Sequence, residues 1–459
     1  MEALNSVVVV VNDLIWTYVL IAMLLIVGLM FTLKSKFVQF KYVDEMVRLL
    51  GDGIGKKTKG VSSFGAFCIS VASRVGTGNL AGVATALAIG GAGAVFWMWL
   101  IAIIGSASSF AESTLAQLYK RRQDDGTYVG GPAYYMETGL GKRWMGVLFA
   151  IIISITFGLF FNSVQSNTIA LAFSPWLGGN TTAIGIALAI LTLAVVFGGV
   201  KRIAFISSVL VPIMAVGYIL VALFVVFSNI GMFGEVITHI FESAFGLREA
   251  VAGGVGAAVM QGVRRGLFSN EAGMGSAPNA AATAEVTHPA KQGLIQTLGV
   301  FTDTLVVCSC TAFIILSSGA PLDGSISGIE LTQKAMDNML GEGFGGTFIA
   351  ICILMFAFSS IIGNYYYGES NIKFITSDKK WLNLYRLMVG AMIFFGAIAS
   401  LNLVWNLADV SMAFMAIINL IAIFLLRDSA IEVLNDYRKQ KKAGIKSPQY
   451  KNDKFEVWK

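Results

Sequence analysis

The chain has 459 residues, of which 56% are hydrophobic and only 13% are charged, and its mean hydropathy is +0.73. A composition this apolar excludes a soluble protein of this size and predicts a membrane protein with many spans. The net charge of +6 does not indicate nucleic-acid binding, because the basic residues lie in short loops between apolar segments, where they report topology.

The first apolar segment covers residues 14–33 and follows the acidic residues Glu2 and Asp13, with no basic residue before it. A cleavable signal peptide begins with a basic region, so we expect a membrane helix that stays in the protein. A lysine-rich stretch follows, and residues 37–50 predict a helix that lies on the cytoplasmic face of the membrane. Residues 1–60 are therefore interpreted as one transmembrane helix and one interfacial helix.

A glycine-broken run, Ser73-Arg74-Val75-Gly76-Thr77-Gly78-Asn79, interrupts the second apolar segment, which extends over residues 65–91. A helix needs about 20 residues to cross a bilayer, so the run lies near the midplane. Non-helical backbone at this depth is tolerated only inside protein or along a wet cavity. The run therefore predicts a broken helix that binds a small ligand and an ion. Close packing of small residues against a neighbouring helix is the alternative.

Nine further apolar segments follow, which predicts an all-α polytopic membrane protein with 11 transmembrane helices. The seventh of the eleven begins near residue 250, is again interrupted by glycine at 253–256 and 262–266, and continues into a loop at 269–278. The other segments lie at about residues 96–118, 145–173, 182–198, 205–228, 293–318, 345–368, 381–401 and 405–426.

The distribution of basic residues predicts the orientation in the cell membrane. Outside the spans, Arg248 and Lys334 alone fall on the face assigned to the exterior, which places the N-terminus outside and the C-terminus in the cytoplasm. Residues 61–230 and 231–430 each hold five helices and each open with a glycine-interrupted helix, which predicts a 5+5 inverted repeat. Residues 431–459 form a basic cytoplasmic tail.

Several polar side chains fall at one predicted depth of the membrane. A Ser or Thr can bond a carbonyl of its own helix and an Asn or Gln amide can bridge two helices, so each one has a structural alternative. Their convergence beside two interrupted helices favours a binding site instead. The residues at this depth are Thr77, Asn79, Asn162, Gln165, Gln261, Ser359 and Ser360.

A zwitterion fits this layer. The N-terminus of a half-helix suits a carboxylate, while backbone carbonyls and the amides of Asn79, Gln165 and Gln261 suit an ammonium group. Phe157 and Phe161 lie one turn apart on the helix face that carries Gln165 and can wall a small pocket, although plain packing is the alternative. The predicted substrate-binding residues are Thr77, Gly78, Asn79, Phe157, Phe161, Gln165, Gln261 and Gly262.

A cation site is predicted beside the first interruption. Unwound carbonyls around Ala72 and Val75, together with the hydroxyls of Ser359 and Ser360, can supply several oxygens to a hard monovalent cation. No free acid is needed for such a site.

Ionisable side chains inside apolar segments are costly and are functional candidates by default. Asp303 and Asp409 can serve as proton or cation sites, but a pair with a buried arginine or a gate is an equal alternative. Four further charged residues are placed toward the inner ends of their helices and are interpreted as gating or structural ion pairs. They are Glu112, Arg264, Arg265 and Glu271.

Cysteine and histidine usage does not indicate an enzyme. The two histidines belong to no metal-binding pattern, and no catalytic pair is evident. We expect no cofactor, no nucleic acid and no obligate protein partner. The four cysteines lie in apolar segments without Cys-x-x-Cys spacing and are expected to be buried reduced thiols; they are Cys68, Cys308, Cys310 and Cys352.

Four stretches resemble the alanine or glycine:cation symporter family, sodium-coupled amino-acid carriers of bacteria and archaea. They are the run at 73–79, GGAGAVFWMW at 90–99 with Gly105 at its end, GGP at 130–132, and GLFSNEAGMGSAP at 266–278. The resemblance covers almost the whole chain. It implies a fold similar to that of the leucine transporter with one added N-terminal helix.

The resemblance also implies site residues. Ala72, Val75, Ser359 and Ser360 match positions that form a sodium site in related carriers, and Phe356 would add a backbone carbonyl there. Asn79 matches a position that contacts substrate or a second sodium ion. Arg74, inside the broken run, is not a feature that the general fold predicts.

These features predict a sodium-driven importer of alanine or glycine that works by alternating access, with sodium as the coupling ion and the bilayer as its surroundings. Proton coupling through Asp303 or Asp409 is one alternative. A channel is a less favoured alternative, since broken helices and polar midplane residues also occur in pores. An intramembrane enzyme is the weakest.

Overall fold

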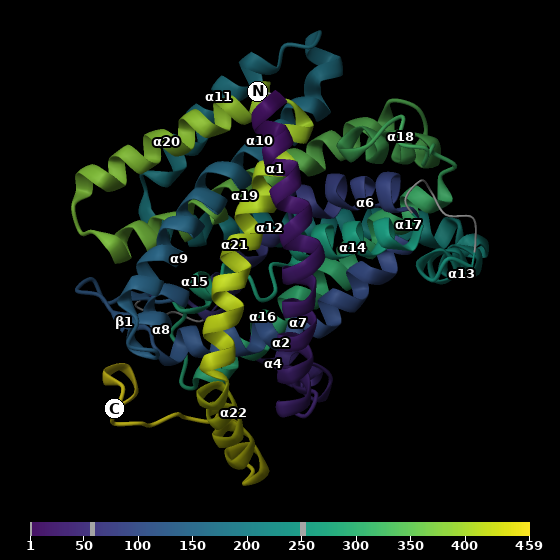
Figure 1. The fold of residues 1–459 in the computed structure, drawn as a ribbon. Coiled ribbons are helices and arrows are strands. Elements are labelled where there is room, and N and C mark those ends of the chain that lie inside the picture. Colours follow the sequence, from purple (N-terminus) through teal and green to yellow (C-terminus); the bar gives the residue numbers. More distant parts are fainter. Residues whose placement is uncertain (1, 56–59, 248–253) are drawn as a thin grey trace.

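The computed structural model describes residues 2–55, 60–247 and 254–459, so the predicted Arg248 and Gly253 lie outside the described residues. Helices dominate the described part, and β1 (Arg121–Arg122) pairs with β2 (Tyr128–Val129) in a short antiparallel hairpin (Figure 1). Eight of the described helices are long and apolar enough to cross a membrane, so the predicted all-α architecture with many spans is confirmed at that level. They are Val8–Lys34, Gly93–Leu118, Arg143–Leu177, Gly199–Ser228, Pro289–Ser317, Phe344–Ile375, Lys379–Ile398 and Leu401–Leu425.

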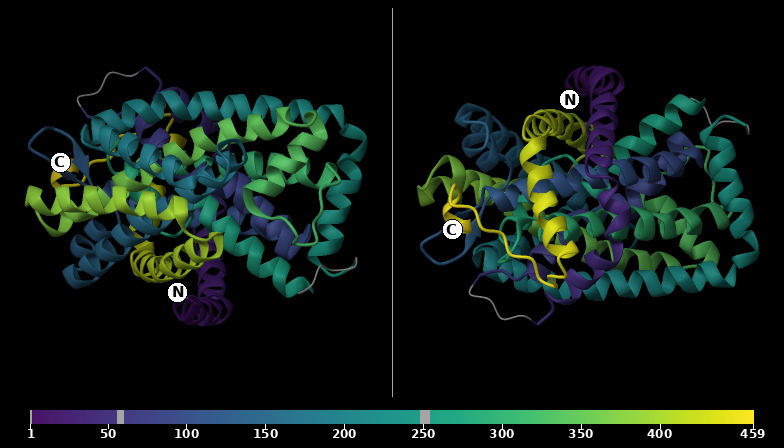
Figure 2. Two further views of the ribbon diagram at one scale, coloured as in Figure 1. Left: turned by 90° about the horizontal axis from the view of Figure 1, so that it is seen from above. Right: turned by 90° about the horizontal axis from the view of Figure 1, so that it is seen from below.

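The N-terminal helix runs along one edge of the molecule. Its three consecutive parts are α1 (Glu2–Ile15), the π-helical turn η1 (Trp16–Leu20) and α2 (Ile21–Lys34). It packs against α21 (Leu401–Leu425), and the purple and yellow helices lie side by side in both views of Figure 2. Two short helices follow in the segment predicted to be interfacial, α3 (Val38–Lys41) and α4 (Val43–Gly51).

The first interruption lies where the glycine-broken run predicts it. Helix α5 (Ser63–Arg74) is capped at its N-terminus by Ser62, whose Oγ accepts a hydrogen bond from the Gly65 N–H at 3.0 Å. It ends at Val75, whose φ of −79° and ψ of 91° are extended. The chain turns helical again at η2 (Gly78–Gly82) and continues as α6 (Val83–Gly90). The backbone between α5 and η2 is buried. Unwound backbone in a membrane is tolerated only where protein encloses it or where it lines a wet cavity.

The rest of the first half is helical apart from the hairpin. The long helices α9, η3 and α10 form one continuous rod, and α12 contains a proline, Pro212. The elements are α7 (Gly93–Leu118), α8 (Pro132–Thr138), α9 (Arg143–Ile155), η3 (Thr156–Phe161), α10 (Asn162–Phe173), η4 (Ser174–Leu177), α11 (Thr181–Val196) and α12 (Gly199–Ser228).

The second interruption lies further along the chain than we predicted. Helix α14 (Gly254–Asn270) runs without a break through the glycines at 256 and 262–266, and the helix stops only at residues 271–276 before α15 (Ala277–Ala281). Glu271, Gly273 and Gly275 have positive φ values of 57°, 85° and 83°, so a left-handed turn ends the helix. Gly262 and Gly266 inside α14 serve close packing against α7 instead.

The remaining elements complete the second half and the tail. Helix α16 and α17 are joined by a π-helical segment, η6, and α19 is the longest of them with 32 residues. The elements are η5 (Ile230–Met232), α13 (Phe233–Ala244), α16 (Pro289–Val300), η6 (Phe301–Cys308), α17 (Ser309–Ser317), α18 (Gly328–Leu340), α19 (Phe344–Ile375), α20 (Lys379–Ile398), α22 (Arg427–Lys442) and η7 (Glu456–Trp458).

Small residues let the long helices approach each other closely. A Cβ atom on Gly262 of α14 would lie 2.4 Å from the Ala94 carbonyl oxygen of α7, and one on Gly293 of α16 would lie 2.2 Å from Thr114 Oγ1 of α7. Helix α7 therefore packs along both α14 and α16, while α10 packs along α19 and α20. All four cysteines are buried and free, which confirms the prediction of reduced thiols.

The C-terminal tail is tied to the same end of the molecule as α22. The Tyr450 N–H donates to the Thr287 carbonyl at 2.8 Å, and Trp458 Nε1 donates to the Gln117 carbonyl at 3.2 Å. His288 lies beside this contact, where its Nδ1 accepts from the Ala290 N–H at 3.2 Å. Since Nδ1 accepts, Nε2 carries the proton and donates to Asp436 Oδ2 at 3.0 Å. Burial lowers the pKa of His288 to about 4, so the imidazole is neutral at physiological pH.

Acidification should therefore weaken this end of the protein through His288. Its pKa in the folded state is below the ordinary value of 6.5, so the unfolded chain binds the proton more readily. The free energy of unfolding therefore falls as the pH drops below about 6.5, and by pH 5 the loss is about 2 kcal/mol. In His288→Asn the side-chain oxygen can still accept from Ala290, and we expect the thermal unfolding midpoint to lose part of its pH dependence. His239→Asn serves as the control; an identical pH dependence in His288→Asn and wild type would contradict this assignment.

Candidate functional site at two helix breaks

The five predicted sodium ligands lie together beside the first helix break. Ser360 Oγ lies 2.8 Å from the Ala72 carbonyl oxygen, 3.4 Å from that of Val75 and 3.0 Å from that of Phe356. Ser359 Oγ lies 2.8 Å from the Phe356 oxygen and 3.4 Å from that of Ala72. All five residues are buried. The cluster therefore joins the unwound end of α5 to the middle of α19 through carbonyl and hydroxyl oxygens alone.

The N–H groups exposed by the break are held by side-chain oxygens. Gln165 Oε1 on α10 accepts from the Thr77 N–H at 3.0 Å and from Thr77 Oγ1 at 2.6 Å. The Gly76 N–H donates to Asn79 Oδ1 at 2.8 Å. An oxygen acceptor is thus the chemical group that this stretch of backbone binds.

A buried carboxylate connects the two broken helices. Asp303 Oδ1 accepts from Asn79 Nδ2 at 2.7 Å, and Oδ2 accepts from Ser269 Oγ and Thr304 Oγ1, both at 2.8 Å. Asn79 belongs to the first broken helix and Ser269 to the second. Gly78 lies where these helices touch, since a Cβ atom there would be 3.0 Å from the Cα atom of Ser269. Hydroxyl and amide groups, which are neutral, make these direct contacts with Asp303.

A row of aromatic rings passes beside Gln165. The Phe157 and Phe161 rings, which we predicted to wall the site, have centroids 4.5 Å apart. The row continues from Phe161 to Phe268 at 4.5 Å and from Phe268 to Trp405 at 4.6 Å. Phe268 and Trp405 were not among the predicted site residues. Phe268 precedes Ser269 within the family-like stretch and could have been found from that position, whereas Trp405 is brought in by the packing of α21.

Trp405 also marks the boundary with a layer of charged residues. The Arg265 guanidinium lies 4.4 Å from the centre of the Trp405 ring and forms an ion pair with Asp409. Arg264 pairs with Asp13 of the N-terminal helix at 3.0 Å. The two arginines therefore lie toward the start of α21 and the N-terminal helix. Both ion pairs agree with our interpretation of Arg264 and Arg265 as members of structural ion pairs.

Glu112 and Glu271 complete the second break. Glu112 accepts from the Gly273 and Gly275 N–H groups, both at 3.1 Å, and from Asn419 Nδ2 at 2.8 Å. Glu271 accepts from Ser73 Oγ and from Ser276 Oγ, both at 2.6 Å. These carboxylates satisfy backbone and hydroxyl donors that unwinding of the helix exposes, which supports a structural role.

Arg74 is likewise built into the packing around the breaks. Its Nη1 atom donates to the carbonyl oxygen and to Oε1 of Gln296, both at 3.2 Å. A Cβ atom on Gly299 would lie 2.4 Å from Nη1, so a glycine on α16 makes room for the guanidinium. The arginine inside the broken run is thereby accommodated by α16.

Two predicted substrate residues, Gln261 and Gly262, are not brought to this cluster. Gln261 lies at the end of α6, since a Cβ atom on Gly90 would be 3.1 Å from its Cβ, and Gly262 packs against Ala94. Because α14 continues to Asn270, position 261 lies about 13 Å along the helix axis from the break. Our estimate of depth assumed that the glycine runs interrupt the helix.

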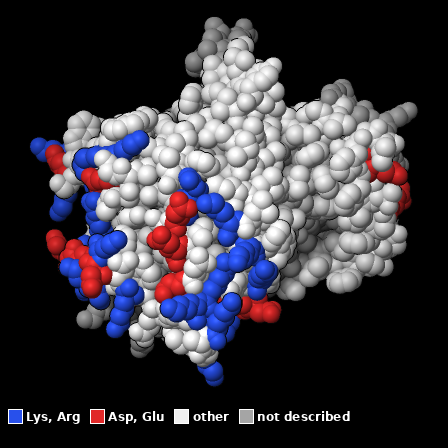
Figure 3. Space-filling view, turned by 60° about the horizontal axis from the view of Figure 1, so that its bottom comes forward, with Lys and Arg blue, Asp and Glu red and all other residues white. Residues whose placement is uncertain are grey.

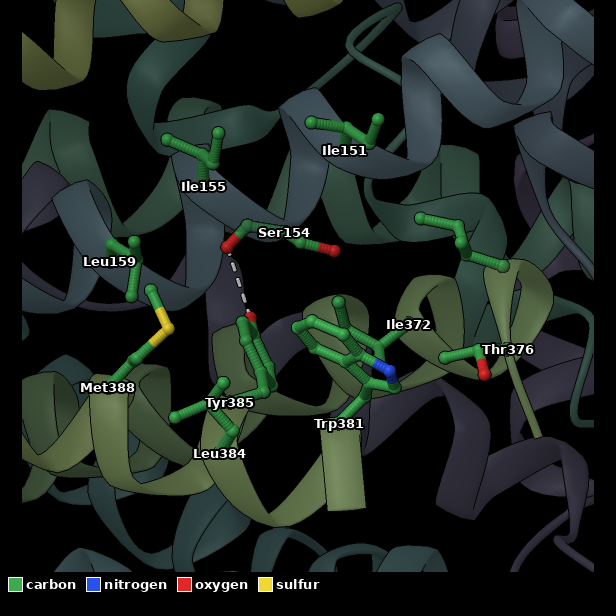
Figure 4. A pocket seen from close by; sticks show the side chains of 11 residues that line it. Ile151, Ser154, Ile155, Leu159, Ile372, Thr376, Trp381, Leu384, Tyr385 and Met388 are labelled. Carbon is green, nitrogen blue, oxygen red and sulfur yellow. Dashed lines mark hydrogen bonds between the residues drawn. The ribbon is translucent and has the colours of Figure 1, made fainter. Parts of the chain in front are cut away.

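An apolar cavity of about 380 Å³ lies elsewhere, between α9, α19 and α20 (Figure 4). Its polar groups are already engaged: Tyr385 Oη donates to the Ser154 carbonyl at 3.1 Å, and Thr376 Oγ1 accepts from the Asp378 N–H at 3.2 Å. The Ser154 hydroxyl donates to the Ala150 carbonyl at 2.7 Å, and the remaining side chains shown are apolar except for the Trp381 indole. This apolar lining does not suit a zwitterion.

The model of the sodium:alanine symporter family matches residues 1–452. The chain belongs to this family. It is 55% identical over 98% of its length to the "Probable sodium/glutamine symporter GlnT" of Bacillus subtilis (strain 168), of which 94% is covered. It is 38% identical over 94% of its length to the "Sodium/alanine symporter AgcS" of Methanococcus maripaludis, of which 97% is covered. These relatives are named as symporters, which points away from an enzyme.

Solved structures support the fold of this sodium:alanine symporter family member. MhsT, solved in complex with L-phenylalanine, matches with a TM-score of 0.58 and 12% identity, covering 83% of this chain and 99% of that one. A sodium-coupled sialic acid symporter matches with a TM-score of 0.50 and 16% identity, covering 84% and 82%. The predicted similarity to the leucine-transporter fold is confirmed. The chain is thus a membrane protein with several spans, and its family is one of cation-coupled amino-acid symporters.

Proposed function

We propose that this protein is a sodium-coupled symporter that imports a small neutral amino acid, alanine or glycine, by alternating access. The observation that carries the proposal is the meeting of two helix breaks at one buried cluster, with carbonyl and hydroxyl oxygens on one side and the Gln165–Thr77 contact on the other. Discontinuous helices at mid-depth are how secondary transporters hold a substrate and its coupling ion. Family membership supports the same class of activity.

The proposed protein architecture has 11 membrane spans, with a 5+5 inverted repeat at residues 61–230 and 231–430. Each proposed repeat opens with an interrupted helix, α5 to α6 in the first and α14 to α15 in the second. The lysine-rich residues 431–459 are assigned to the cytoplasm and the N-terminus to the exterior of the cell membrane. Figure 3 supports this orientation, because the Lys and Arg side chains in view gather at the end of the molecule that carries α22.

We assign sodium to the oxygens of Ala72, Val75, Phe356, Ser359 and Ser360. Three carbonyls and two hydroxyls offer hard ligands without a formal charge, which suits a monovalent cation. The two serines belong to α19, and the first two carbonyls belong to the end of α5. A sodium ion bound there would join these helices, and its release would allow them to move apart.

We assign the substrate to the adjoining residues Thr77, Gly78, Asn79 and Gln165 and to the aromatic row. A substrate carboxylate would take the place of the Gln165 oxygen at the Thr77 N–H. The buried Trp405 Nε1 has no hydrogen-bond partner among the described residues and offers a further donor. Gln261 and Gly262 are left outside this assignment because they pack against α6 and α7.

Uptake of labelled alanine, glycine and glutamine into proteoliposomes tests the proposal. We expect accumulation of alanine or glycine above equilibrium under an inward sodium gradient, and none under matched potassium or proton gradients. Glutamine is included because the relative GlnT is named for it. Saturable counterflow of labelled substrate separates a carrier from a channel. Failure of all three amino acids to accumulate would contradict the proposed function.

Proton coupling is a second candidate because of the position of Asp303. Its carboxylate is buried between the two broken helices and is contacted directly by neutral donors, whereas Asp409 is paired with Arg265. A relative at 45% identity is named "Putative sodium/proton-dependent alanine carrier protein YrbD".

The variant Asp303→Asn separates the two coupling ions. We expect slower uptake that still follows the sodium gradient, because an amide can keep some of the contacts to Asn79 and Ser269. Ser269→Ala is the matched control, since it removes one donor and keeps the carboxylate. Accumulation driven by a pH gradient without sodium, lost in Asp303→Asn and kept in Ser269→Ala, would instead identify Asp303 as the proton-coupling residue.

A further inference from the structure

A basic cavity of about 500 Å³ lies between the turn that follows α2 and the helix α22. Five of its lining residues are cationic and none is acidic, while Tyr42 and Asn435 complete the wall. It lies at the end of the molecule where the charged side chains gather in Figure 3, far along the chain from the helix breaks. The cationic residues are Lys36, Lys41, Arg438, Lys439 and Lys442.

Among the described residues, the five cations that line this cavity form no ion pair. Two carboxylates of the neighbouring segments pair with cations that do not line the cavity: Asp428 pairs with Lys34 at 3.1 Å, and Glu45 pairs with Arg48 at 2.7 Å and with Lys441 at 3.2 Å. Gathering five like charges is unfavourable unless an anion binds among them.

The cavity is held in shape by a strained turn and by its arginine. Lys36 and Phe37 have φ values of 51° and 60°, which side chains other than glycine rarely adopt. Arg438 donates to the Ser35 carbonyl, and its guanidinium lies 5.9 Å from the centre of the Tyr42 ring. These contacts join the turn to α22, so the cations come from two segments that lie about 400 residues apart in the sequence.

Three exposed apolar side chains, here called the apolar rim, flank the lysines of the cavity in sequence. Leu33, Phe37 and Phe40 are 63%, 45% and 52% exposed, and they flank Lys36 in sequence. Exposed apolar side chains next to lysines, directly after a membrane helix, are typical of the boundary between acyl chains and headgroups. These side chains therefore suit a position where the acyl chains of the bilayer meet its headgroups.

We propose that this cavity binds the phosphate group of an anionic membrane lipid of the cytoplasmic leaflet. Lysine and arginine side chains supply charge-assisted hydrogen bonds to phosphate oxygens, and Leu33, Phe37 and Phe40 lie beside the acyl chains. Inorganic phosphate shares the headgroup chemistry but gains nothing from the apolar rim. The bound lipid links the N-terminal helix to α22, which directly follows α21, and should stabilise the folded protein.

Thermal unfolding of the full chain in nanodiscs tests this inference. We expect nanodiscs that contain phosphatidylglycerol to raise the unfolding midpoint by several degrees over phosphatidylcholine alone. The variant K36Q/K439Q/K442Q should lose most of that rise. The control K446Q/K451Q/K459Q removes the same number of charges from exposed tail positions and should keep it. Equal midpoints of both variants and wild type in phosphatidylcholine would show that the substitutions leave the fold intact.

Three outcomes would overturn the inference. The absence of a rise with phosphatidylglycerol would show that no anionic lipid is bound, and an equal loss in both triple variants would show a diffuse effect of surface charge. A rise of the same size with inorganic phosphate in phosphatidylcholine, lost in K36Q/K439Q/K442Q, would assign the cavity to free phosphate. Native mass spectrometry, which counts retained phosphatidylglycerol molecules, gives a second readout that does not depend on transport.

Discussion

Replacing both Ser359 and Ser360 with alanine should raise the sodium concentration for half-maximal uptake by about 30-fold. Each hydroxyl contributes roughly 1 kcal/mol to a contact of this kind, and two together give about that loss of affinity. The carbonyls of Ala72, Val75 and Phe356 remain but no longer complete the set of oxygens. Sodium titration of alanine uptake in proteoliposomes measures the change.

The double variant should otherwise fold normally, because alanine favours a helix and both serines lie inside α19. Ser208→Ala is the matched control: its hydroxyl also bonds a carbonyl of its own helix, that of Phe205 at 2.7 Å, but on the exposed surface of α12. An unchanged sodium dependence in a well-folded double variant would remove these serines from the coupling site. A loss of sodium affinity in Ser208→Ala would show that the effect is not local.

Gly76→Ala should lower the uptake rate by about 100-fold while most of the protein remains folded. The added Cβ atom would lie 2.2 Å from Ser360 Oγ and 3.0 Å from Gln165 Oε1, so it would push apart the two groups assigned to sodium and substrate. The φ angle of Gly76 is not positive, so crowding and not backbone strain is the cause. Uptake measured against both sodium and alanine concentration shows which site is affected.

A suitable control for Gly76→Ala is Gly217→Ala in α12. An added Cβ atom at Gly217 has nothing within 4 Å, and alanine favours a helix, so this variant should transport normally. Equal amounts of both variants in the membrane and equal unfolding midpoints exclude misfolding as the reason for lost uptake. Full transport by a folded Gly76→Ala variant would show that substrate and sodium do not meet at this break.

Some of the site was predictable because it depends on local sequence. The first break follows from Gly76 and Gly78 inside an apolar segment. The two glycines lower the helix propensity there, and lipid offers the backbone no other hydrogen-bond partner. The residues that contact this break were harder to predict from the sequence. The hydrogen bond of Gln165 with Thr77 and the ring contact of Phe161 with Phe268 both depend on packing against distant helices.

The second break shows where local patterns mislead. Glycines at 253–256 and 262–266 suggest an interruption, yet Gly262 lies against the Ala94 carbonyl and serves close packing of α14 on α7. The helix stops later, where Glu112 of α7 accepts the N–H groups of Gly273 and Gly275. A glycine in a helix is compatible with either role, and the neighbouring helix selects between them.

Composition and the order of apolar segments were sufficient to define a helical membrane protein, because the bilayer forces every backbone group to pair within its own segment. The family-like stretches pointed to sodium-coupled transport, which family membership supports. The contacts of Asp303, Arg265 and Trp405 became visible in the folded chain alone. The contacts Asp303–Asn79, Arg265–Asp409 and Trp405–Phe268 join residues that lie far apart in the sequence, and no local pattern records which helices lie side by side.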